Sequence, residues 1–439
     1  MLSVLEARRL VLQHSRSMSA VRMPPSDCLG LVLAEEITSD IDSPPFDKSM
    51  VDGYAVRSAD LTGGHGQLEV IEEIIAGATA QKTGEPGQCW RIMTGAPIPA
   101  GADAVVMHER TTFIESDVAS GRHADAGAGF GRLGRVQIAE HKFRVGQNIM
   151  RRGAAMRRGD ALLSPGHTMR PIEIGLLAEV GRTEITVIDR PSAAILSTGN
   201  ELVPPDRLPA AGQIRNSNGP MLAAAIRAAG ATPVELGISR DEPAALRNAL
   251  GEGLRSDVLI ISGGVSAGAL DLVPGLLQEL GVVEVFHKIN LRPGKPLWFG
   301  SHARPTSSAS SLGPRPSPLA PSLVFGLPGN PVSSLVCFEL FVRAALAQLA
   351  GRTVSEALAT TRARLSTGFV QHGDRPTFHP AVVSSQRAAL TSDPTIVPLR
   401  WSGSADLRAL ASANALAIFP PGDREFTAGE EVEILPLFP

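Results

Sequence analysis

The chain has 439 residues, of which 43% are hydrophobic and 19% are charged, and its formal net charge is -3 at neutral pH. A chain of this length is too long to fold around one hydrophobic core, so we expect three or four domains. The near balance of 41 basic and 44 acidic residues argues against a broad nucleic-acid-binding surface, which needs a basic excess. A small anionic ligand stays compatible with this balance, because a local cluster of cations is enough to bind one.

Neither the cysteines nor the apolar runs predict a secreted or membrane-spanning protein. Cys28, Cys89 and Cys337 are far apart and form no CxxC pair, which excludes a zinc ribbon and a disulfide framework. The N-terminal stretch MLSVLEARRLVLQHS has charges among its apolar residues and lacks the uninterrupted core of a signal peptide. No run of about 18 apolar residues occurs, so no transmembrane helix is expected. We therefore expect a cytoplasmic protein.

The first part of the chain predicts a helix followed by a small β domain. Apolar residues at helical spacing predict a helix over residues 4–18. Between residues 68 and 146, runs such as LEVIEEI, CWRIM and RVQIAE have β character and no helical periodicity. Residues 119–134 are Gly-rich and polar, and predict a long mobile hairpin loop between two of these runs.

After about residue 182, strand and helix patterns alternate. The buried-type strands SAAILSTG and DVLIISGG and the strand TPVELGI alternate with the helical patterns PMLAAAIRAAG, EPAALRNALGEGL and VPGLLQELG. This alternation predicts βαβ units and a parallel sheet covered on both faces. Residues 301–322 are dominated by Pro and Ser and predict a disordered insertion between two strands. A helix ends at Gly351, and the remainder predicts a small β barrel.

Three Gly-rich or polar turns follow the predicted strands. They are residues 196–201 (LSTGNE), residues 262–266 (SGGVS) and residues 326–331 (GLPGNP). In open α/β sheets, ligands bind beyond the carboxyl ends of the strands, and glycines let backbone N–H groups approach phosphate oxygens. Each turn alone is compatible with an ordinary tight turn, but three in successive units favour one ligand site. No Walker loop occurs and no GxGxxG follows a strand, so nucleoside triphosphatase and dinucleotide-binding functions are not expected.

A basic loop and a set of acids are predicted near the same edge of the sheet. Guanidinium and ammonium groups suit a tetrahedral oxyanion, and in HKINLRPGKP they belong to Lys288, Arg292 and Lys295. The alternative interpretation is that these basic residues form a solvent-exposed surface segment. Carboxylates suit Mg²⁺, and those near this edge are Glu201, Asp241 and Asp271. Asp241 could equally cap a helix.

Further motifs resemble those of a known family. Residues 44–49 (PPFDKS) and 52–56 (DGYAV) resemble the PPFDNSAMDGYAV signature of molybdopterin molybdenumtransferases, also called molybdenum insertases, which include the C-terminal domain of gephyrin. Residues 91–96 (RIMTGA), continued by residues 99–106, resemble a second family block. The three turns and the RPGKP loop resemble further blocks. The matches follow the family order from about residue 2 to residue 437.

The resemblance implies an α/β multidomain fold. Its centre would be a three-layer α/β/α domain with a mostly parallel sheet, accompanied by an elongated N-terminal region, a small β domain and a C-terminal β barrel. The resemblance implies a discontinuous N-terminal domain at 1–43 and 147–182, with a small β domain inserted at 44–146. A molybdopterin-binding α/β domain would follow at 183–351 and would contain the 301–322 insertion. A barrel would occupy residues 352–439.

The resemblance also implies a reaction and its residues. Adenylylated molybdopterin would be cleaved with Mg²⁺, AMP would be released, and molybdenum would pass from molybdate to the dithiolene. The implied catalytic residues are Asp47, Asp52, Thr94, Glu201, Asp241 and Asp271, of which Glu201, Asp241 and Asp271 would also bind the metal. Together with the turns, it assigns cofactor and substrate binding to Ser197, Thr198, Gly199, Ser262, Gly263, Gly264, Ser266, Lys288, Arg292, Lys295, Pro296, Pro328, Pro331, Arg375 and Ser404. Arg292, Lys295 and Pro296 match the family's molybdate pocket.

The implied partners are a second copy of the chain, in a homodimer whose sites lie between protomers, and also molybdopterin adenylyltransferase and downstream cofactor-maturation enzymes. Nucleic acid and membrane are not expected partners. The chain departs from the family pattern at Ala154-Ala155 and Ala269, where acids are usual, and at Lys48, where Asn is common. The missing acids leave open a cofactor-binding paralogue with weakened catalysis. The shared α/β domain leaves open the molybdopterin adenylyltransferase that acts before this step, which the SGGVS turn and the additional domains disfavour.

Overall fold

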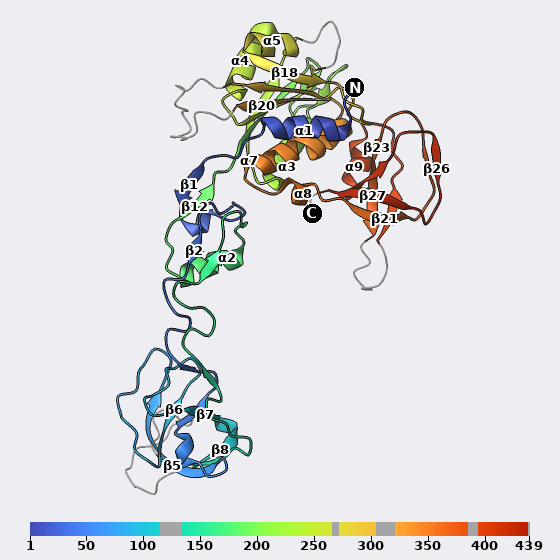
Figure 1. The fold of residues 1–439 in the computed structure, drawn as a ribbon. Helices are drawn as coiled ribbons and strands as arrows, with labels where there is room; N and C mark the ends of the chain where they lie inside the picture. Colours follow the sequence, from blue (N-terminus) through green and yellow to red (C-terminus); the bar gives the residue numbers. More distant parts are fainter. Residues whose placement is uncertain (115–133, 266–271, 304–320, 385–393, 438–439) are drawn as a thin grey trace. The chain divides into compact units, whose positions relative to one another are not determined.

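The structure is a computed structural model that describes residues 1–114, 134–265, 272–303, 321–384 and 394–437 (Figure 1). The chain forms two compact units, one of Met1–Glu35, Pro165–Leu177 and Arg182–Pro439, the other of Glu36–Ser164 and Ala178–Gly181. The four-domain boundaries remain a prediction. Most of the predicted loop at 119–134 and of the predicted insertion at 301–322 lies outside the described residues, as do Ser266, Ala269 and Asp271.

A six-stranded sheet forms the centre of the larger unit. Its strand order is β16 (Thr232–Ser239), β13 (Ser192–Thr198), β17 (Val258–Ser262), β20 (Ser322–Leu327), β19 (Trp298–His302) and β18 (Val282–His287). The first four strands are parallel, whereas β19 and β18 pair antiparallel. Ser197 pairs with Ser262 and Ser262 pairs with Leu327, so three parallel strands end level with one another. The prediction of a mostly parallel sheet is confirmed.

Alternate residues of the parallel strands enter two different hydrophobic cores, as the period of a strand requires. Ala193 and Ile195 of β13 pack with α1 (Val4–His14) and α3 (Asn218–Ala228). Ala194 and Leu196 pack instead with α4 (Pro243–Gly253) and α5 (Val273–Glu279). Figure 1 shows α4 and α5 on one face of the sheet and α1, α3 and α7 on the other. This arrangement is the predicted three-layer α/β/α domain.

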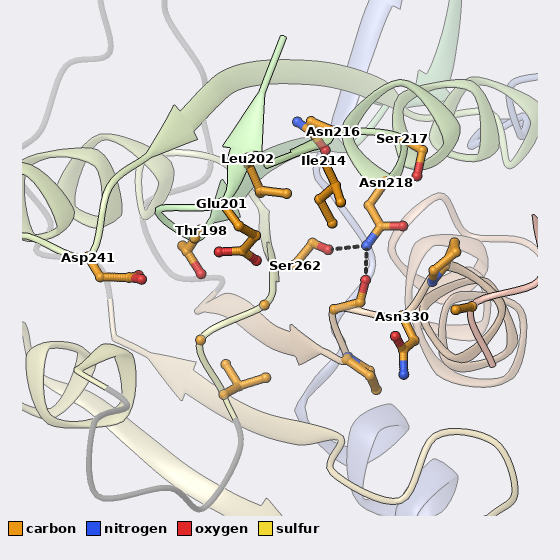
Figure 2. A pocket seen from close by; sticks show the side chains of 18 of the residues that line it. Thr198, Glu201, Leu202, Ile214, Asn216, Ser217, Asn218, Asp241, Ser262 and Asn330 are labelled. Atoms are coloured by element: carbon orange, nitrogen blue, oxygen red, sulfur yellow. Dashed lines mark hydrogen bonds between the residues drawn. The ribbon is translucent and has the colours of Figure 1, made fainter. Parts of the chain in front are cut away.

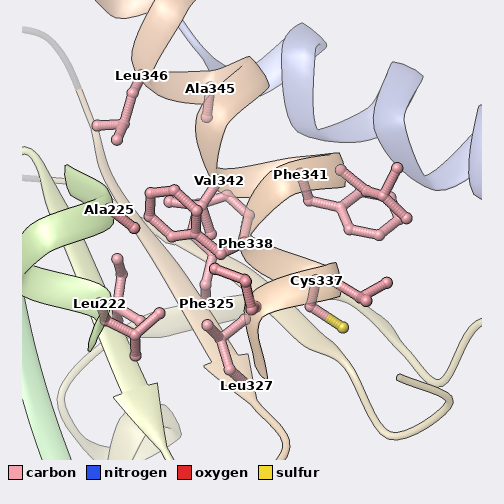
Figure 3. Close-up of a cluster of buried hydrophobic side chains, with 14 of the residues drawn as sticks. Leu222, Ala225, Phe325, Leu327, Cys337, Phe338, Phe341, Val342, Ala345 and Leu346 are labelled. Carbon is pink, nitrogen blue, oxygen red and sulfur yellow. The ribbon is translucent and has the colours of Figure 1, made fainter. Parts of the chain in front are cut away.

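A continuous helical stretch from Pro331 to Leu349 fills the core on the α3 side. It consists of α6 (Pro331–Cys337), the π-helical η4 (Phe338–Val342) and α7 (Arg343–Leu349). By length and composition this stretch could cross a membrane, but 89% of its apolar window is buried inside the protein. Figure 3 shows Phe338 and Val342 among Leu222 of α3 and Phe325 of β20. Packing in this core therefore explains the apolar character of the helix.

The first helix is shorter than its periodicity predicts. α1 ends at His14 rather than at residue 18. Ser15 has an extended backbone at the C-cap position, and its hydroxyl donates to the Val11 carbonyl oxygen at 2.9 Å. A serine that bonds to the backbone of the preceding turn competes with helix continuation. At the start of the helix, Ser3 and Glu6 form a capping box, which satisfies two backbone N–H groups.

A closed five-stranded barrel forms the C-terminal part of the larger unit, as predicted. Its strand order is β21 (Thr361–Leu365), β24 (Thr395–Pro398), β23 (Thr377–Ser384), β25 (Ala415–Phe419) and β27 (Glu431–Pro436). Ile396 and Phe419 are buried inside the barrel. Leu416 and Leu435 belong instead to the core on the α3 side of the sheet. The barrel therefore shares a hydrophobic interface with the α/β part.

Shorter elements complete the larger unit. Its two-stranded pairs are β1 (Ala20–Met23) with β12 (Ile185–Ile188), β14 (Leu202–Val203) with β15 (Ile214–Arg215), and β22 (Phe369–Gln371) with β26 (Arg424–Phe426). Its short helices are η1 (Pro25–Asp27), α8 (Val354–Ala357) and α9 (Leu407–Ala411). Helix α2 (Pro171–Glu179) has residues in both units.

The smaller unit is built on a second six-stranded sheet. The strand order is β7 (Ala104–Met107), β4 (Gly53–Val56), β6 (Gln88–Ile92), β5 (His65–Ile74), β9 (Arg135–Ala139) and β8 (Thr111–Ile114). Two pairs of short strands accompany it, namely β2 (Ile37–Thr38) with β11 (Ala161–Leu163) and β3 (Lys48–Ser49) with β10 (Ile149–Met150), together with η2 (Ser58–Asp60) and η3 (His108–Arg110). The β runs predicted between residues 68 and 146 are therefore confirmed where the structure describes them.

Phe338 is one of the largest fully buried side chains, and its removal should leave a cavity at the centre of the helical core. We expect Phe338→Ala to lower the free energy of unfolding of the larger unit by about 3–5 kcal/mol, measured by guanidinium unfolding. Ile172→Ala is the matched control, because Ile172 is 74% exposed, and it should change stability by less than about 0.5 kcal/mol. If both substitutions changed the free energy of unfolding equally, the packing of Phe338 in this core would be contradicted.

Glu339 of η4 is fully buried, and burial raises the pKa of its carboxyl group to about 7, although Arg343 Nη1 lies 2.9 Å from Oε2 and opposes this rise. Between the ordinary pKa of 4.5 and about 7, the folded chain keeps a proton that the unfolded chain has lost. The free energy of unfolding therefore falls as the pH rises through this window. We expect Glu339→Gln to remove this fall, so that wild type loses stability relative to the variant from about pH 4.5 to about pH 7. If the difference in the free energy of unfolding between wild type and Glu339→Gln stays constant with pH, the raised pKa of Glu339 is refuted.

Candidate functional site

A cavity of about 770 Å³ lies at the carboxyl ends of the parallel strands (Figure 2). All three predicted turns contribute to its wall, through Thr198, Gly199 and Glu201, through residues 262–265, and through residues 328–331. The turns meet because β13, β17 and β20 are parallel and in register, which places their carboxyl ends at one edge. Residues of the predicted set that line the cavity are Thr198, Gly199, Glu201, Asp241, Ser262, Gly263, Gly264, Pro296, Pro328 and Pro331.

Two glycines allow the turns to pack closely. A Cβ atom on Gly199 would lie 2.6 Å from the Glu201 carboxylate, and one on Gly263 would lie 2.7 Å from the Thr198 carbonyl oxygen. Both residues have positive φ angles, +146° and +91°. Their backbone N–H groups donate to the carbonyl oxygens of Ser239 and Leu327. Gly263 therefore allows the second turn to approach the first closely, and Gly199 leaves room for the Glu201 side chain of its own turn. Neither N–H is left to donate to an anion.

Glu201 and Asp241 line the same cavity and lie on the left of Figure 2. The Asn200 side-chain oxygen accepts the Asp241 backbone N–H at 3.2 Å, which ties the first turn to the segment after β16. Helix α4 begins at Pro243, with Glu242 at the N-cap position and no side-chain cap hydrogen bond. The alternative in which Asp241 caps this helix is therefore wrong.

The donor set at this end of the cavity fits a hard divalent cation. Mg²⁺ is usually held by one or two carboxylates together with water and substrate phosphates, and Glu201 and Asp241 supply two carboxylates. In the described part of the chain, no group of three or more His, Cys, Asp or Glu side chains could hold a metal ion by itself. Beside the described residues, a cation here would therefore need water or substrate oxygens as further ligands.

Asn216 and Asn218, which the sequence analysis missed, line the other end of the cavity together with Asn330 of the third turn, on the right of Figure 2. Asn218 Nδ2 donates to Ser262 Oγ at 2.8 Å and to the Gly329 carbonyl oxygen at 2.7 Å. Asn330 Nδ2 donates to Ser404 Oγ at 2.9 Å. The available signal was the run Asn216-Ser217-Asn218 directly before a predicted helix, but such residues are usually explained as helix caps.

Two other predicted residues lie behind or beside this wall. The Ser197 hydroxyl donates to Asn216 Oδ1 at 3.2 Å and is buried, so Ser197 supports the wall from behind. Ser404 lies next to the third turn, because its carbonyl oxygen accepts the Val332 N–H at 3.0 Å and its hydroxyl accepts from Asn330. Ser404 therefore connects the α/β part to the segment that follows the barrel strand β24.

The predicted basic loop lies at the junction with the barrel. Arg292 Nη1 donates to the His372 carbonyl oxygen at 2.8 Å, and Arg375 Nη1 donates to the Leu291 carbonyl oxygen at 3.3 Å. Lys295 and Arg292 are exposed, and Lys288 is half-buried. Of this loop only Pro296 is among the described residues that line the cavity, and the one cation among those residues is Arg215, which the sequence analysis missed.

The predicted residues of the smaller unit form two hydrogen-bonded groups. Asp52 Oδ1 accepts from the Thr94 hydroxyl and from the Thr94 N–H, both at 2.7 Å, and these bonds lower the pKa of Asp52. Asp47 accepts from the Arg152 N–H at 2.8 Å and from Arg151 Nη1 at 2.5 Å. The Arg152 bond, supported by Arg151, lowers the pKa of Asp47. Both carboxylates are therefore ionised near neutral pH.

Three family models match successive parts of the chain. The MoeA N-terminal region (domain I and II) matches residues 2–181, a probable molybdopterin-binding domain matches residues 194–348, and the MoeA C-terminal region (domain IV) matches residues 362–437. The cavity described above is built from residues of the second match together with Ala405 and Leu407 of the third.

Curated proteins and solved structures resemble the chain over nearly its whole length. Molybdopterin molybdenumtransferases from Staphylococcus aureus strain Mu50 and Bacillus subtilis strain 168 are 32% and 34% identical over 98% of this chain, and the matches cover 94% and 93% of those proteins. A crystal structure of the molybdopterin biosynthesis protein MoeA from Pyrococcus horikoshii superposes with a TM-score of 0.75 at 29% identity, covering 100% of this chain and 99% of the other. The chain therefore belongs to the MoeA family, whose curated members are molybdopterin molybdenumtransferases.

Proposed function

We propose that this chain is a cytoplasmic enzyme of molybdenum cofactor biosynthesis that transfers molybdenum from molybdate to molybdopterin, with cleavage of adenylylated molybdopterin and release of AMP. The observation that carries the proposal is the single cavity in which the three turns meet two carboxylates at the edge of a parallel sheet. The names of relatives that match over almost their full length support the same activity.

The two ends of the cavity suit different parts of such a substrate. Glu201 and Asp241 would hold Mg²⁺ against the phosphates, where the ion would neutralise charge during cleavage of the phosphate anhydride. Arg215 also lines the cavity, and its guanidinium would suit phosphate oxygens. Thr198 and Ser262 contribute hydroxyl groups, which position a ligand without adding charge.

The basic loop at the barrel junction is the proposed molybdate site. Arg292 and Lys295 are exposed, and Arg375 belongs to the barrel loop that Arg292 contacts. Molybdate is a tetrahedral dianion, and a guanidinium fork beside an ammonium group matches both its charge and its oxygen geometry. Pro296 lies in this loop and also lines the cavity, so the loop adjoins the proposed substrate site.

The carboxylates should matter for turnover more than for folding. We expect Glu201→Gln and Asp241→Asn each to lower AMP release from adenylylated molybdopterin, with molybdate and Mg²⁺ present, by about 10²-fold or more. Wild type that forms adenylylated molybdopterin from ATP, rather than consuming it, would indicate the adenylyltransferase alternative. Wild type that binds the substrate without turnover would indicate the weakened paralogue. The control is Glu433→Gln on the barrel strand β27, which should keep wild-type turnover.

We further propose that the enzyme is a homodimer with shared sites, to which one protomer contributes Asp52 and Thr94 and the other contributes Glu201 and Asp241. Light scattering should then give about twice the 46.1 kDa chain mass. Co-expression of the Asp52→Asn and Glu201→Gln variants should restore about a quarter of wild-type turnover, because half of the dimers would be mixed and each would contain one intact site. An inactive mixture, or an active monomer, would exclude shared sites.

A further inference from the structure

The orientation of the Asn218 side chain is fixed by its partners. Asn218 begins α3 and is 8% exposed. Its Nδ2 atom donates to the Gly329 carbonyl oxygen and to Ser262 Oγ. Because a backbone carbonyl can only accept a hydrogen bond, the amide nitrogen must face Gly329 and the amide cannot be flipped. The other amide atom, Oδ1, is buried and receives no hydrogen bond from the described residues.

A second polar atom of the same cavity has the same property. Thr198 Oγ1 is buried and has no hydrogen-bond partner among the described residues, and Thr198 is 3% exposed. Asn218 and Thr198 both line the cavity, from two different elements (Figure 2). Buried polar groups in native proteins are almost always hydrogen-bonded. Two such atoms in the wall of one cavity are therefore candidates for hydrogen bonds with a ligand.

The chemistry of Oδ1 restricts what it can contact. An amide oxygen only accepts hydrogen bonds, so it repels the oxygens of phosphate, pyrophosphate and molybdate. A favourable ligand group must carry an N–H or O–H donor. Figure 2 places Asn218 on the side of the view opposite Asp241 and Glu201, where the phosphates would be held. The amide end of the cavity thus suits an uncharged heterocycle with N–H donors along one edge.

On the basis of the proposed function, we propose that Asn218 is a specificity-determining residue, whose Oδ1 accepts a hydrogen bond from an N–H of the heterocyclic part of the substrate. The two Nδ2 bonds hold the second and third turns at fixed distances from this acceptor. They also prevent the amide from rotating to offer a donor instead. Preorganisation of this kind is what selective binding sites require. The pterin and the adenine of adenylylated molybdopterin both carry such donors.

The test uses two uncharged probes, pterin and adenosine, titrated into the full-length protein by calorimetry. We expect wild type to bind one of them, and Asn218→Ala to weaken that affinity about tenfold or more, because a site built to bond an N–H group loses selectivity when its acceptor is removed. An N-methylated form of the probe that binds, which lacks the N–H donor, should bind wild type about tenfold more weakly than the parent probe, whereas Asn218→Ala should bind the two forms about equally. The probe that responds identifies the part of the substrate at this end.

The matched control is Asn414→Ala, which removes an asparagine that exchanges two hydrogen bonds with Val383 in the barrel, and it should leave both affinities unchanged. If Asn218→Ala does not fold, Asn218→Ser replaces it, because its shorter side chain places no acceptor at Oδ1. No loss of affinity in Asn218→Ala, or an equal effect of N-methylation on wild type and Asn218→Ala, would overturn the acceptor role. So would wild type that binds neither probe. Turnover of adenylylated molybdopterin by wild type, measured in parallel, separates these results from a failure of the proposed function.

Discussion

The in-register parallel pairing of β13, β17 and β20 is the constraint on which the candidate site depends. It brings the ends of three strands that are widely separated along the chain to one edge, where Ser262 is level with Ser197 and with Leu327. A slip of one residue would move a turn by about 3.3 Å and would exchange the two faces of the strand. Because helices bury both faces, the hydrophobic cores that stabilise the sheet also fix the positions of the turns.

The turns and the acids could be predicted because their signals are local. Strands that end in glycine or serine before a helix predict a ligand-binding edge, and Glu201 and Asp241 follow two such strands directly. Asn218 could not be predicted in the same way. Its role depends on Ser262 and Gly329, which come from two other strand ends. In the sequence, an asparagine at the start of a helix is already explained by capping preferences.

The basic loop illustrates a second limit of sequence reasoning. The presence of its cationic side chains could be predicted from composition, but the direction in which these side chains point depends on tertiary contacts. Gly294 packs against the Cys337 sulfur, where a Cβ would approach within 2.7 Å, and Arg292 is bound to a carbonyl of the barrel. Glu339 is a similar case, because a lone acid in an apolar helix does not reveal from sequence that it is fully buried. The Cys337 sulfur and the barrel carbonyl are distant in sequence from the basic loop, and periodicity and spacing do not identify such partners.

Hydrogen–deuterium exchange of the full-length protein, with and without adenylylated molybdopterin, tests most directly whether the three turns form one substrate site. Ligand contact and reduced local opening slow the exchange of backbone amides. We expect slower exchange in residues 198–201, 262–265 and 328–331 together, and at the start of α3. Protection limited to a single turn, or confined to the barrel, would contradict a shared site at the edge of the sheet.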